Sequence, residues 1–269
     1  INHIGVFTLK VTNTTNGCTA TDGVAVTSVN QSPTATATGG TFNCAQPSVT
    51  LNATYSPTNT IFIWNGPGGY TSHLLQPTVG VPGSYLFTVT DTLTTCFSKA
   101  TALVVADTSK PTAVAGGGGI ITCVQTSVSL TGTGTPAGVT FAWTGPNGFT
   151  SALQNPTVSA PGTYQLTVTK PQNGCTATSS IMVTSNTTPP IASASVNGTL
   201  TCVVNSLQIF GNGAPAGVTF SWTGPNGFSS TAQSPTVFGP GAYVLTVTNP
   251  QNGCKASATA TVTSNTTPP

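Results

Sequence analysis

The chain has 269 residues, and only eight of them are charged: five lysines and three aspartates, with no arginine or glutamate. A net charge of +2 over this length provides no basic surface for nucleic acid, so nucleic acid is excluded as a predicted partner. No run approaches the roughly 18 apolar residues of a membrane-spanning helix, so we expect no membrane insertion by this segment. We expect Ile1 to lie inside a longer chain, with any secretion signal further upstream.

The first 30 residues predict two strands and nothing more. The predicted strands are GVFTLKVT (5–12) and CTATDGVAVTSV (18–29). They match the last two strands of each later copy of a repeat. Residues 1–30 are therefore predicted to be a truncated copy.

A 79-residue interval organises the rest of the chain. The cysteines that recur at this interval are Cys44, Cys123 and Cys202, and then Cys96, Cys175 and Cys254. Three full copies are predicted at 31–108, 109–187 and 188–269. About 80 residues is the size of a small domain with its own modest core.

Each full copy predicts short strands separated by turns. In the second copy the expected strands are 111–116, 119–123, 127–132, 139–144, 155–159, 162–169 and 175–184. Asn-Gly pairs at 147–148 and 173–174 favour tight hairpins. Glycines near the start of each copy predict a kink that absorbs the single length difference between copies. The fold class is predicted as all-β, with tandem immunoglobulin-like β-sandwich repeats arranged as a straight rod.

A Trp followed by a Gly-Pro turn marks each full copy: WNGPGGY (64–70), WTGPNGF (143–149) and WTGPNGF (222–228). Such a motif forms either a structural joint or a ligand-binding loop shown several times over. Phe141 and Trp143 lie two residues apart and so share one face of a strand, where these sandwiches place a central core Trp. We therefore interpret the motif as a joint, with Trp64, Trp143 and Trp222 in the cores.

A second motif places a Tyr after a Pro-Gly turn: PGSY (82–85), PGTY (161–164) and PGAY (240–243). Tyr85, Tyr164 and Tyr243 match the tyrosine corner of immunoglobulin-like sandwiches, in which the hydroxyl bonds back to nearby backbone. The truncated copy has Phe7 at this position, which predicts that ring packing persists there without the hydrogen bond.

The string WTGPNGFTS…QNPTVSAPGTYQLTVT…NGCTATSSIMVTSNTTPP resembles the PKD-like and Ig-like repeats of large cell-surface proteins in Bacteroidota. Among these are gliding-motility-type adhesins exported by type IX secretion. The resemblance covers the whole chain and implies an extracellular, cell-surface location. The acidic WDFGDG turn typical of PKD domains is replaced here by WTGPNG.

Catalysis, cofactors and structural metals are not expected. Acid–base chemistry needs titratable groups placed together, whereas His3 and His73 lie in different copies and the three aspartates are scattered. Calcium takes several hard oxygen ligands, and only Asp107 lies near a junction between copies. Zinc needs clustered Cys or His, and these cysteines are spaced singly.

One modification is predicted from the resemblance. Asp91-Thr92-Leu93 resembles the short O-glycosylation motif of exported Bacteroidota proteins, which makes Thr92 a candidate. An ordinary hairpin turn explains the same three residues equally well.

The predicted function is structural: a stalk or fibre segment of an exported bacterial surface protein that supports adhesion. The predicted partners are neighbouring repeats of the same protein, with lateral or end-to-end self-association into fibres; the adhesive target is unknown. The alternative is a multivalent glycan-binding array, in which weak sites in the Gly-Pro-Asn-Gly-Phe loop gain avidity by repetition.

Regularly spaced cysteines in an exported protein predict disulfides. Pairing within a copy is the simplest scheme: Cys44–Cys96, Cys123–Cys175 and Cys202–Cys254. The expected strand order places Cys123 and Cys175 at opposite ends of their copy, whereas a disulfide needs Cα atoms within about 7 Å. This favours staples across successive junctions, Cys44–Cys175 and Cys123–Cys254, with Cys18, Cys96 and Cys202 pairing outside the segment. Both schemes remain open at this point.

Overall fold

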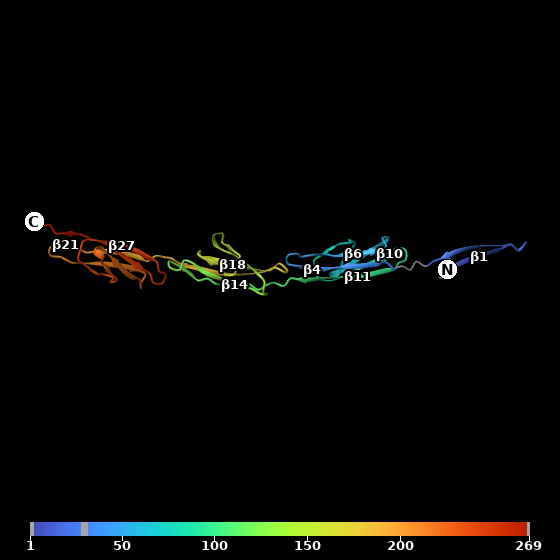
Figure 1. The fold of residues 1–269 in the computed structure, drawn as a ribbon, viewed down its shortest axis with the longest axis horizontal. Coiled ribbons are helices and arrows are strands. Elements are labelled where there is room, and N and C mark those ends of the chain that lie inside the picture. The colour runs from blue at the N-terminus through green and yellow to red at the C-terminus, as the bar shows by residue number, and fades with distance from the viewer. Residues whose placement is uncertain (1–2, 28–31, 268–269) are drawn as a thin grey trace. The chain divides into compact units, whose positions relative to one another are not determined.

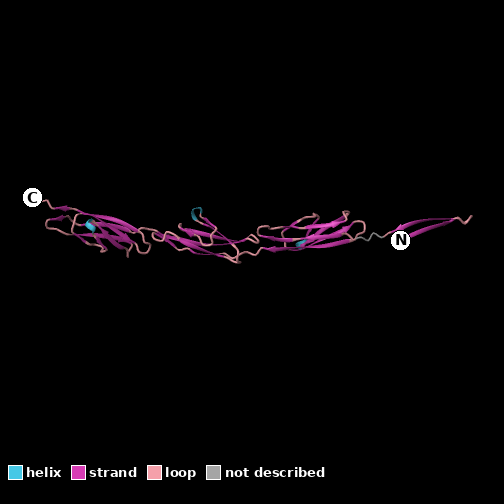
Figure 2. Cartoon of the chain, viewed as in Figure 1, coloured by secondary structure: helices cyan, strands magenta, loops and turns pink. Residues whose placement is uncertain are grey.

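The computed structural model describes residues 3–27 and 32–267 of the chain. The described chain divides into two compact units: residues 1–109 with the turn 172–175, and residues 110–171 with 176–269. Strands dominate both, and the helical pieces are three short 3-10 turns (Figure 2). No described helix has the length and apolar character to cross a membrane. The predicted boundary between residues 30 and 31 lies outside the described residues.

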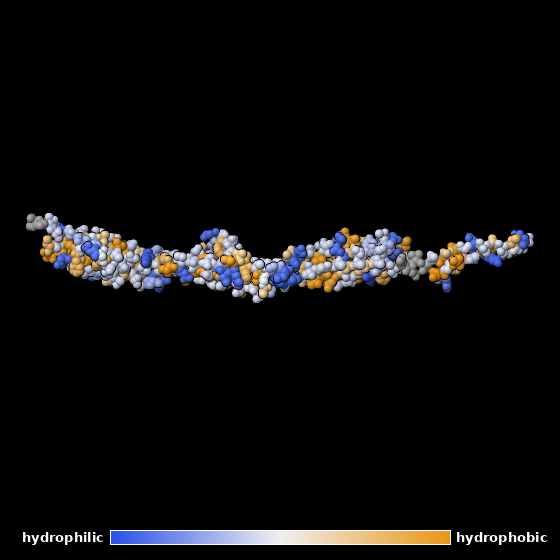
Figure 3. Space-filling view, viewed as in Figure 1, coloured by the Kyte–Doolittle hydropathy of each residue, from blue (hydrophilic) through white to orange (hydrophobic). Residues whose placement is uncertain are grey.

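The N-terminal part of the first unit is a two-stranded antiparallel ribbon formed by β1 (Gly5–Thr12) and β2 (Thr19–Val26). Its apolar side chains are exposed, and hydrophobic surface is visible on the ribbon (Figure 3). Leu9 is 68% exposed and Phe7 is 37% exposed. The expectation that the Phe7 ring packs in a core is therefore wrong, because none of the described strands covers this ribbon with a second sheet.

The first full repeat is a sandwich with a five-stranded sheet on one side and two strand pairs on the other (Figure 1). One sheet contains, in order, β4 (Gly40–Asn43), β11 (Phe97–Asp107), β10 (Gly83–Asp91), β7 (Thr60–Gly66) and β8 (Tyr70–Ser72). The facing strands pair β3 (Thr34–Thr38) with β6 (Asn52–Ser56), and β5 (Val49–Thr50) with β9 (Thr78–Val79). Only β4 and β11 run parallel; the other pairs are antiparallel, as in immunoglobulin-like sandwiches.

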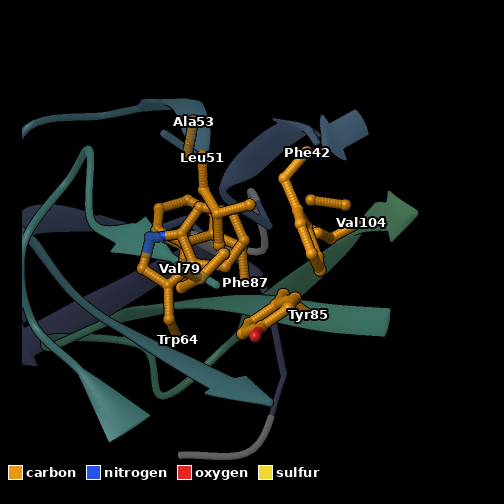
Figure 4. Close-up of a cluster of buried hydrophobic side chains, with 10 residues drawn as sticks. Phe42, Leu51, Ala53, Trp64, Val79, Tyr85, Phe87 and Val104 are labelled. Atoms are coloured by element: carbon orange, nitrogen blue, oxygen red, sulfur yellow. The ribbon is translucent and has the colours of Figure 1, made fainter. Parts of the chain in front are cut away.

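Alternating side chains of these strands fill the core of the first repeat. In β10, Tyr85, Phe87 and Val89 point inward and are each at most 1% exposed. Trp64 is fully buried, and its ring centroid lies 4.8 Å from that of Phe87 (Figure 4). Burial of large side chains on this scale contributes about 1.5–3 kcal/mol each, which holds the two sheets together.

The second unit contains the other two full repeats, which have equivalent strand pairings. The strands of the second repeat are β12 (Val114–Gly117), β13 (Ile120–Thr122), β14 (Val128–Thr133), β15 (Thr140–Thr144), β16 (Thr150–Ser151), β17 (Thr157–Val158), β18 (Gly162–Lys170) and β19 (Cys175–Asn186). The strands of the third repeat are β20 (Ile191–Val196), β21 (Leu200–Thr201), β22 (Leu207–Ala214), β23 (Thr219–Thr223), β24 (Ser229–Ser230), β25 (Thr236–Val237), β26 (Gly241–Thr248), β27 (Lys255–Val262) and β28 (Ser264–Asn265). All seven strands expected in the second repeat are present, and β16 is an additional one.

The glycine kink near the start of each repeat is a switch between sheets. In the second repeat, β12 pairs antiparallel with β14, and β13 pairs parallel with β19 on the other sheet. Gly117, Gly118 and Gly119 make the crossing, with φ values of 73°, 73° and 137° that side chains with a Cβ rarely adopt. The first repeat crosses through Gly39, where a Cβ would lie 2.0 Å from the carbonyl oxygen of Leu103.

Candidate functional site

The Gly-Pro loop after each core Trp is a structural joint. In the second repeat, Pro146–Gly148 forms a single 3-10 turn rather than a two-residue hairpin, with Asn147 at φ 56°. The ring of Phe149 then packs edge-on against Tyr164, with centroids 5.4 Å apart. At Gly145, a Cβ would lie 2.4 Å from the Tyr164 ring, so only glycine fits. The loop thus packs against its own repeat.

The corner Tyr side chains are held by hydrogen bonds. The hydroxyls of Tyr85, Tyr164 and Tyr243 each donate to a carbonyl four residues upstream, at 2.8, 2.8 and 2.9 Å. The structure therefore contains the tyrosine corner. Burial, and secondarily the nearby Tyr70, raise the pKa of Tyr85, which keeps its hydroxyl protonated as a donor.

The indoles of the second and third repeats donate to the backbone, but the indole of the first repeat does not. Trp143 Nε1 bonds the Gln154 carbonyl at 3.2 Å, and Trp222 Nε1 bonds the Gln233 carbonyl at 3.3 Å. Trp64 Nε1 is buried with no partner. All three indoles are nevertheless at most 1% exposed, so the core position predicted for them is where the structure places them.

The chemistry that distinguishes this chain lies in the turn before the last strand of a repeat. We call Asn16-Gly17-Cys18, Asn173-Gly174-Cys175 and Asn252-Gly253-Cys254 the NGC turns. In all three, the Asn Oδ1 accepts a hydrogen bond from the backbone N–H of the Cys, at 3.1, 3.0 and 2.9 Å. The glycines have nearly identical φ values of 70°, 68° and 68°. The turn is therefore a conserved local shape within this chain.

The NGC turn 173–175 docks against the preceding repeat. Asn173 is 1% exposed, and its Nδ2 donates to Asp107 Oδ1 and to the Ser109 carbonyl, both at 3.0 Å. Its own carbonyl accepts a hydrogen bond from Ala45 N at 3.3 Å. We call Cys44, Ala45, Asp107 and Ser109 the acceptor site of the first repeat.

The NGC turn 252–254 docks in the same way against the second repeat. Asn252 Nδ2 donates to Asn186 Oδ1 at 2.9 Å and to the Thr188 carbonyl at 3.0 Å. Its carbonyl accepts a hydrogen bond from Cys123 N at 3.1 Å. The acceptor site of the second repeat is therefore Cys123, Val124, Asn186 and Thr188, each 79 residues after its counterpart.

A disulfide closes each docked turn. Cys44 is bonded to Cys175, with Cα atoms 4.9 Å apart, and Cys123 is bonded to Cys254, with Cα atoms 5.0 Å apart. These are the staples favoured by the strand-order argument; the within-copy bonds Cys44–Cys96, Cys123–Cys175 and Cys202–Cys254 are not formed. Cys18, Cys96 and Cys202 form no disulfide among the described residues, and their expected pairing outside the segment stays a prediction.

Glycine is required in a docked NGC turn for two reasons. Its positive φ disfavours any residue with a Cβ, and the acceptor site leaves no space for one. A Cβ at Gly174 would lie 2.6 Å from Ala45 Cβ, and one at Gly253 would lie 2.4 Å from Val124 Cγ1. The disulfide, the amide and the glycine thus act at one contact.

The asparagines of the docked turns escaped the sequence analysis, although a signal was present. Asn-Gly-Cys recurs with the cysteines, and a residue with a side-chain oxygen acceptor recurs at Asp107 and Asn186. Asn-Gly was interpreted only as hairpin chemistry. The contacts that bury Asn173 and Asn252 join residues 64–66 positions apart, which no local pattern reveals.

The remaining predicted residues lie apart from these contacts. Thr92 is exposed in the turn after β10, and its hydroxyl donates to the Asn59 carbonyl at 3.3 Å. Its glycosylation stays a prediction. Among the described residues, no group of three or more His, Cys, Asp or Glu side chains is placed to hold a metal ion.

Comparison with known proteins gives structural likeness only. No protein-family model and no curated protein matches the chain. Similar solved structures include Sidekick-1 immunoglobulin domains 1–5, at 15% identity over 97% of this chain and 67% of that one, with a TM-score of 0.31. The four N-terminal Ig domains of Dscam1 isoform 6.9 match at 14% identity over 98% of this chain and 80% of that one, with a TM-score of 0.25. The three N-terminal domains of the bacteriophage RB49 outer capsid protein Hoc match at 13% identity over 87% of this chain and 99% of that one, with a TM-score of 0.32. Because these TM-scores are low, the assignment of the immunoglobulin-like fold rests on the strand pairing within each repeat.

Proposed function

We propose that this chain is a load-bearing stalk or fibre segment of an exported bacterial cell-surface protein that supports adhesion. The observation that carries the proposal is the pair of disulfides joining successive repeats. Disulfides persist in oxidising, extracellular settings, which supports an exported location. The resemblance to Bacteroidota surface repeats supports the same location.

The two disulfides interleave, and this gives them a mechanical consequence. Each bond spans 131 residues, and the second begins inside the loop that the first one closes. Between the two cross-links, the chain therefore runs three times in parallel, through residues 44–123, 123–175 and 175–254. A pulling force must stretch all three segments together, so the shortest segment sets the maximum distance between the two cross-links.

This maximum extension is far below that of the same region with both disulfides reduced. With both bonds closed, full unfolding of residues 44–254 extends by no more than the segment 123–175, which at about 3.4 Å per residue is roughly 180 Å. With both bonds reduced, the same region extends to roughly 700 Å. A stalk built in this way keeps its ends connected over a short distance even when its sandwiches unfold.

Single-molecule force spectroscopy tests the proposal directly. The segment is pulled from tags at its two ends, with and without a phosphine reductant. We expect reduction to add roughly 500 Å of contour length. A Cys123→Ser/Cys254→Ser variant should instead show the longer extension permitted by one remaining 131-residue loop. Equal extension with and without reductant would refute a load-bearing role for the bonds.

The stalk proposal includes the straight rod predicted from junctions of equal length. Small-angle X-ray scattering of the oxidised segment tests it, because a rod and a freely jointed chain differ in their scattering at low angle. The expected rise is on the order of 35–45 Å per repeat, from strands of 7–10 residues at about 3.3 Å each plus turns. A compact particle would rule the rod out.

The glycan-binding alternative would use the Gly-Pro loops, which line open pockets beside Tyr85 in the first repeat and Tyr243 in the third. A sugar platform needs an exposed aromatic face, whereas Phe149 and Phe228 pack edge-on against Tyr164 and Tyr243. A glycan array with the intact segment, and with a Phe149→Ala/Phe228→Ala variant, tests it. Binding that the variant loses would replace the stalk proposal with the lectin-like one.

A further inference from the structure

The five-stranded sheet of the first repeat turns an apolar face to solvent. This outer face, the side away from the core, is formed by β7, β10 and β11, with β8 at one edge. Five of its outward-facing side chains are apolar: Ile61, Ile63, Leu86, Phe97 and Val105. Ile61 is 63% exposed and Phe97 is 59% exposed.

The same face is mostly polar in the other two repeats. At positions 79 residues later, the second repeat has Thr140, Ala142, Gln165, Thr176 and Thr184. The third repeat has Thr219, Ser221, Val244, Lys255 and Thr263. Since the sandwich forms with threonine and serine on this face, the apolar side chains of the first repeat serve something other than its fold.

The strand register places a ring and a groove on opposite sides of the central strand β10. Thr90 of β10 lies between Ile61 of β7 and Phe97 of β11. On the β7 side, Ile61, Ile63, His73 and Thr90 line a groove of about 320 Å³. On the β11 side, the exposed Phe97 ring lies in the same row across the sheet.

We infer that two copies of this chain pair through this face, with Phe97 of each copy in the groove of the other. A two-fold axis along β10 exchanges the β7 side with the β11 side and keeps each row, so that every ring faces a groove. Such a contact is isologous, and its two identical halves form together and close the dimer. The inference rests on the proposed function and specifies a lateral contact between stalk segments.

The size of the face fits a dimer. Five strands at a spacing of about 4.8 Å span about 24 Å, and the nine residues of β10 span about 30 Å. The face therefore covers roughly 700 Å² per copy, whereas a standard specific interface buries about 800 Å² per partner. Pairing of the whole face thus approaches the area that a specific dimer needs.

The charges on the sheet favour a second copy over an acidic partner. Among the described strands of this sheet, Lys99 is the single lysine, and the same strands carry Asp91 and Asp107. The Lys99 Nζ lies 5.2 Å from the ring centroid of Phe97 in its own copy, so its aliphatic stem adds to the apolar surface. One exposed lysine attracts an acidic chain only weakly.

Sedimentation equilibrium of the chain over a range of concentrations tests the pairing. A Cys18→Ser/Cys96→Ser/Cys202→Ser background prevents unpaired thiols from cross-linking copies. We expect a monomer–dimer equilibrium, with no larger species.

Variants that carry residues of the second repeat test the surface. Phe97→Thr and Ile61→Thr change exposed side chains, and each should weaken dimerisation at least about tenfold. Met182→Thr is the matched control, because Met182 is 64% exposed on the outer face of the second repeat, and it should leave dimerisation unchanged. Unchanged unfolding midpoints show that the variants keep their fold.

Mixing the two variants tests the ring-in-groove geometry. Phe97→Thr copies keep the groove, and Ile61→Thr copies keep the ring. A mixed pair retains one intact ring-in-groove contact, whereas either variant paired with itself retains none. We therefore expect heterodimers at concentrations at which each variant alone is monomeric.

Four outcomes would overturn the inference. They are a chain that stays monomeric up to about 1 mM, dimers that both Thr variants leave intact, variants that form no heterodimer, and binding of polyglutamate in place of dimerisation, lost on Lys99→Ala. The last would assign the face to an acidic partner. The force measurement uses single chains, so failure of lateral pairing is distinguishable from failure of the stalk proposal.

Discussion

The first and second repeats present the same hairpin turn before their last strand, but the two turns carry different side chains. In the first repeat, Thr94-Thr95-Cys96 leaves its thiol free, whereas Asn173-Gly174-Cys175 in the second is buried and bonded. Both turns place a residue at positive φ, Thr95 at 58° and Gly174 at 68°. The two turns thus share a backbone shape and differ in their side chains.

The difference lies in what the side chains can reach. Asn173 both closes its own turn and donates out of it to Asp107 and Ser109. In the first repeat the turn is closed from the strand before it, by Asp91 Oδ1 accepting from Leu93 N and Thr94 N at 2.8 and 2.9 Å. The turn of the first repeat has Thr94 in place of Asn173, so it lacks the side-chain amide that donates to the neighbouring repeat. The comparison thus distinguishes hydrogen bonds that close a turn from those that join the turn to another repeat.

Removing a disulfide between repeats should lower the free energy of unfolding more than any other change proposed here. Cys123→Ser/Cys254→Ser opens a 131-residue loop, which the chain-entropy model values at up to about 5 kcal/mol of unfolding free energy. Hydrogen exchange of peptides from the second and third repeats measures the loss. Exchange should be unchanged in the undocked β1–β2 ribbon, and equal acceleration there would contradict a local role for the bond.

Adding a methyl group to a docked turn should have the next largest effect. Gly253→Ala combines strain from φ 68° with a Cβ 2.4 Å from Val124 Cγ1, and should cost about 3 kcal/mol. Gly17→Ala is the matched control, because it has the same φ and open space, and should cost about 1 kcal/mol. Urea unfolding of both variants provides the comparison. Equal costs would show that the close approach to Val124 is unimportant.

Removing the side-chain amide of Asn252 should lower the free energy of unfolding somewhat less. Asn252→Ala leaves Asn186 Oδ1, the Thr188 carbonyl and the Cys254 N–H without their partner, at about 2 kcal/mol. Asn16→Ala removes only an exposed bond to Cys18 N, and should cost less than about 0.5 kcal/mol. Thermal unfolding checks both values. A cost for Asn16→Ala as large as that for Asn252→Ala would argue against the docking contribution.

Relieving strain in the undocked turn should stabilise the first repeat slightly. Thr95 is a β-branched residue at φ 58°, so Thr95→Gly should gain about 1 kcal/mol. The gain should appear as a higher unfolding midpoint for the first repeat alone. A loss instead would mean that the Thr95 hydroxyl, which donates to the Thr94 carbonyl at 2.6 Å, outweighs the strain.

The smallest expected effect depends on pH and is confined to the turn closed by Asp91. Hydrogen bonds from the backbone N–H groups of Thr94 and Leu93 lower the pKa of Asp91 from its usual 3.8. A lowered folded-state pKa contributes stability that is present above pH 3.8 and is lost as the pH falls through the folded value. An acid titration followed by exchange at residues 91–96 should show loosening that Asp91→Asn lacks. The same titration should leave the turn at 249–254 unaffected, because the side chains that bond its backbone are the amides of Asn249 and Asn252.

Several features were accessible from the pattern of residues, because each depends on neighbours in the chain. A strand was expected at 162–169, and β18 is that strand. The Pro-Gly-Tyr motif predicted the tyrosine corner, since the acceptor carbonyl lies only four residues away. The packing expected of Phe7 failed, because ring burial requires a facing sheet that the described part of the truncated copy lacks.

Sequence by itself determined the repeat, the all-β sandwich and the residues of the core, because strand period, turn chemistry and a 79-residue spacing are local or periodic properties. It also limited the cysteine pairings to two schemes through the length of the strands. Only the tertiary structure decided that Asn173 and Asn252 join one repeat to the one before it. Their amides are satisfied by atoms 64–66 residues away, and the short Gly174–Ala45 and Gly253–Val124 approaches exist only once two sandwiches have folded and met. Coupling of this kind depends on distances between separately folded surfaces, which no pattern within one copy contains.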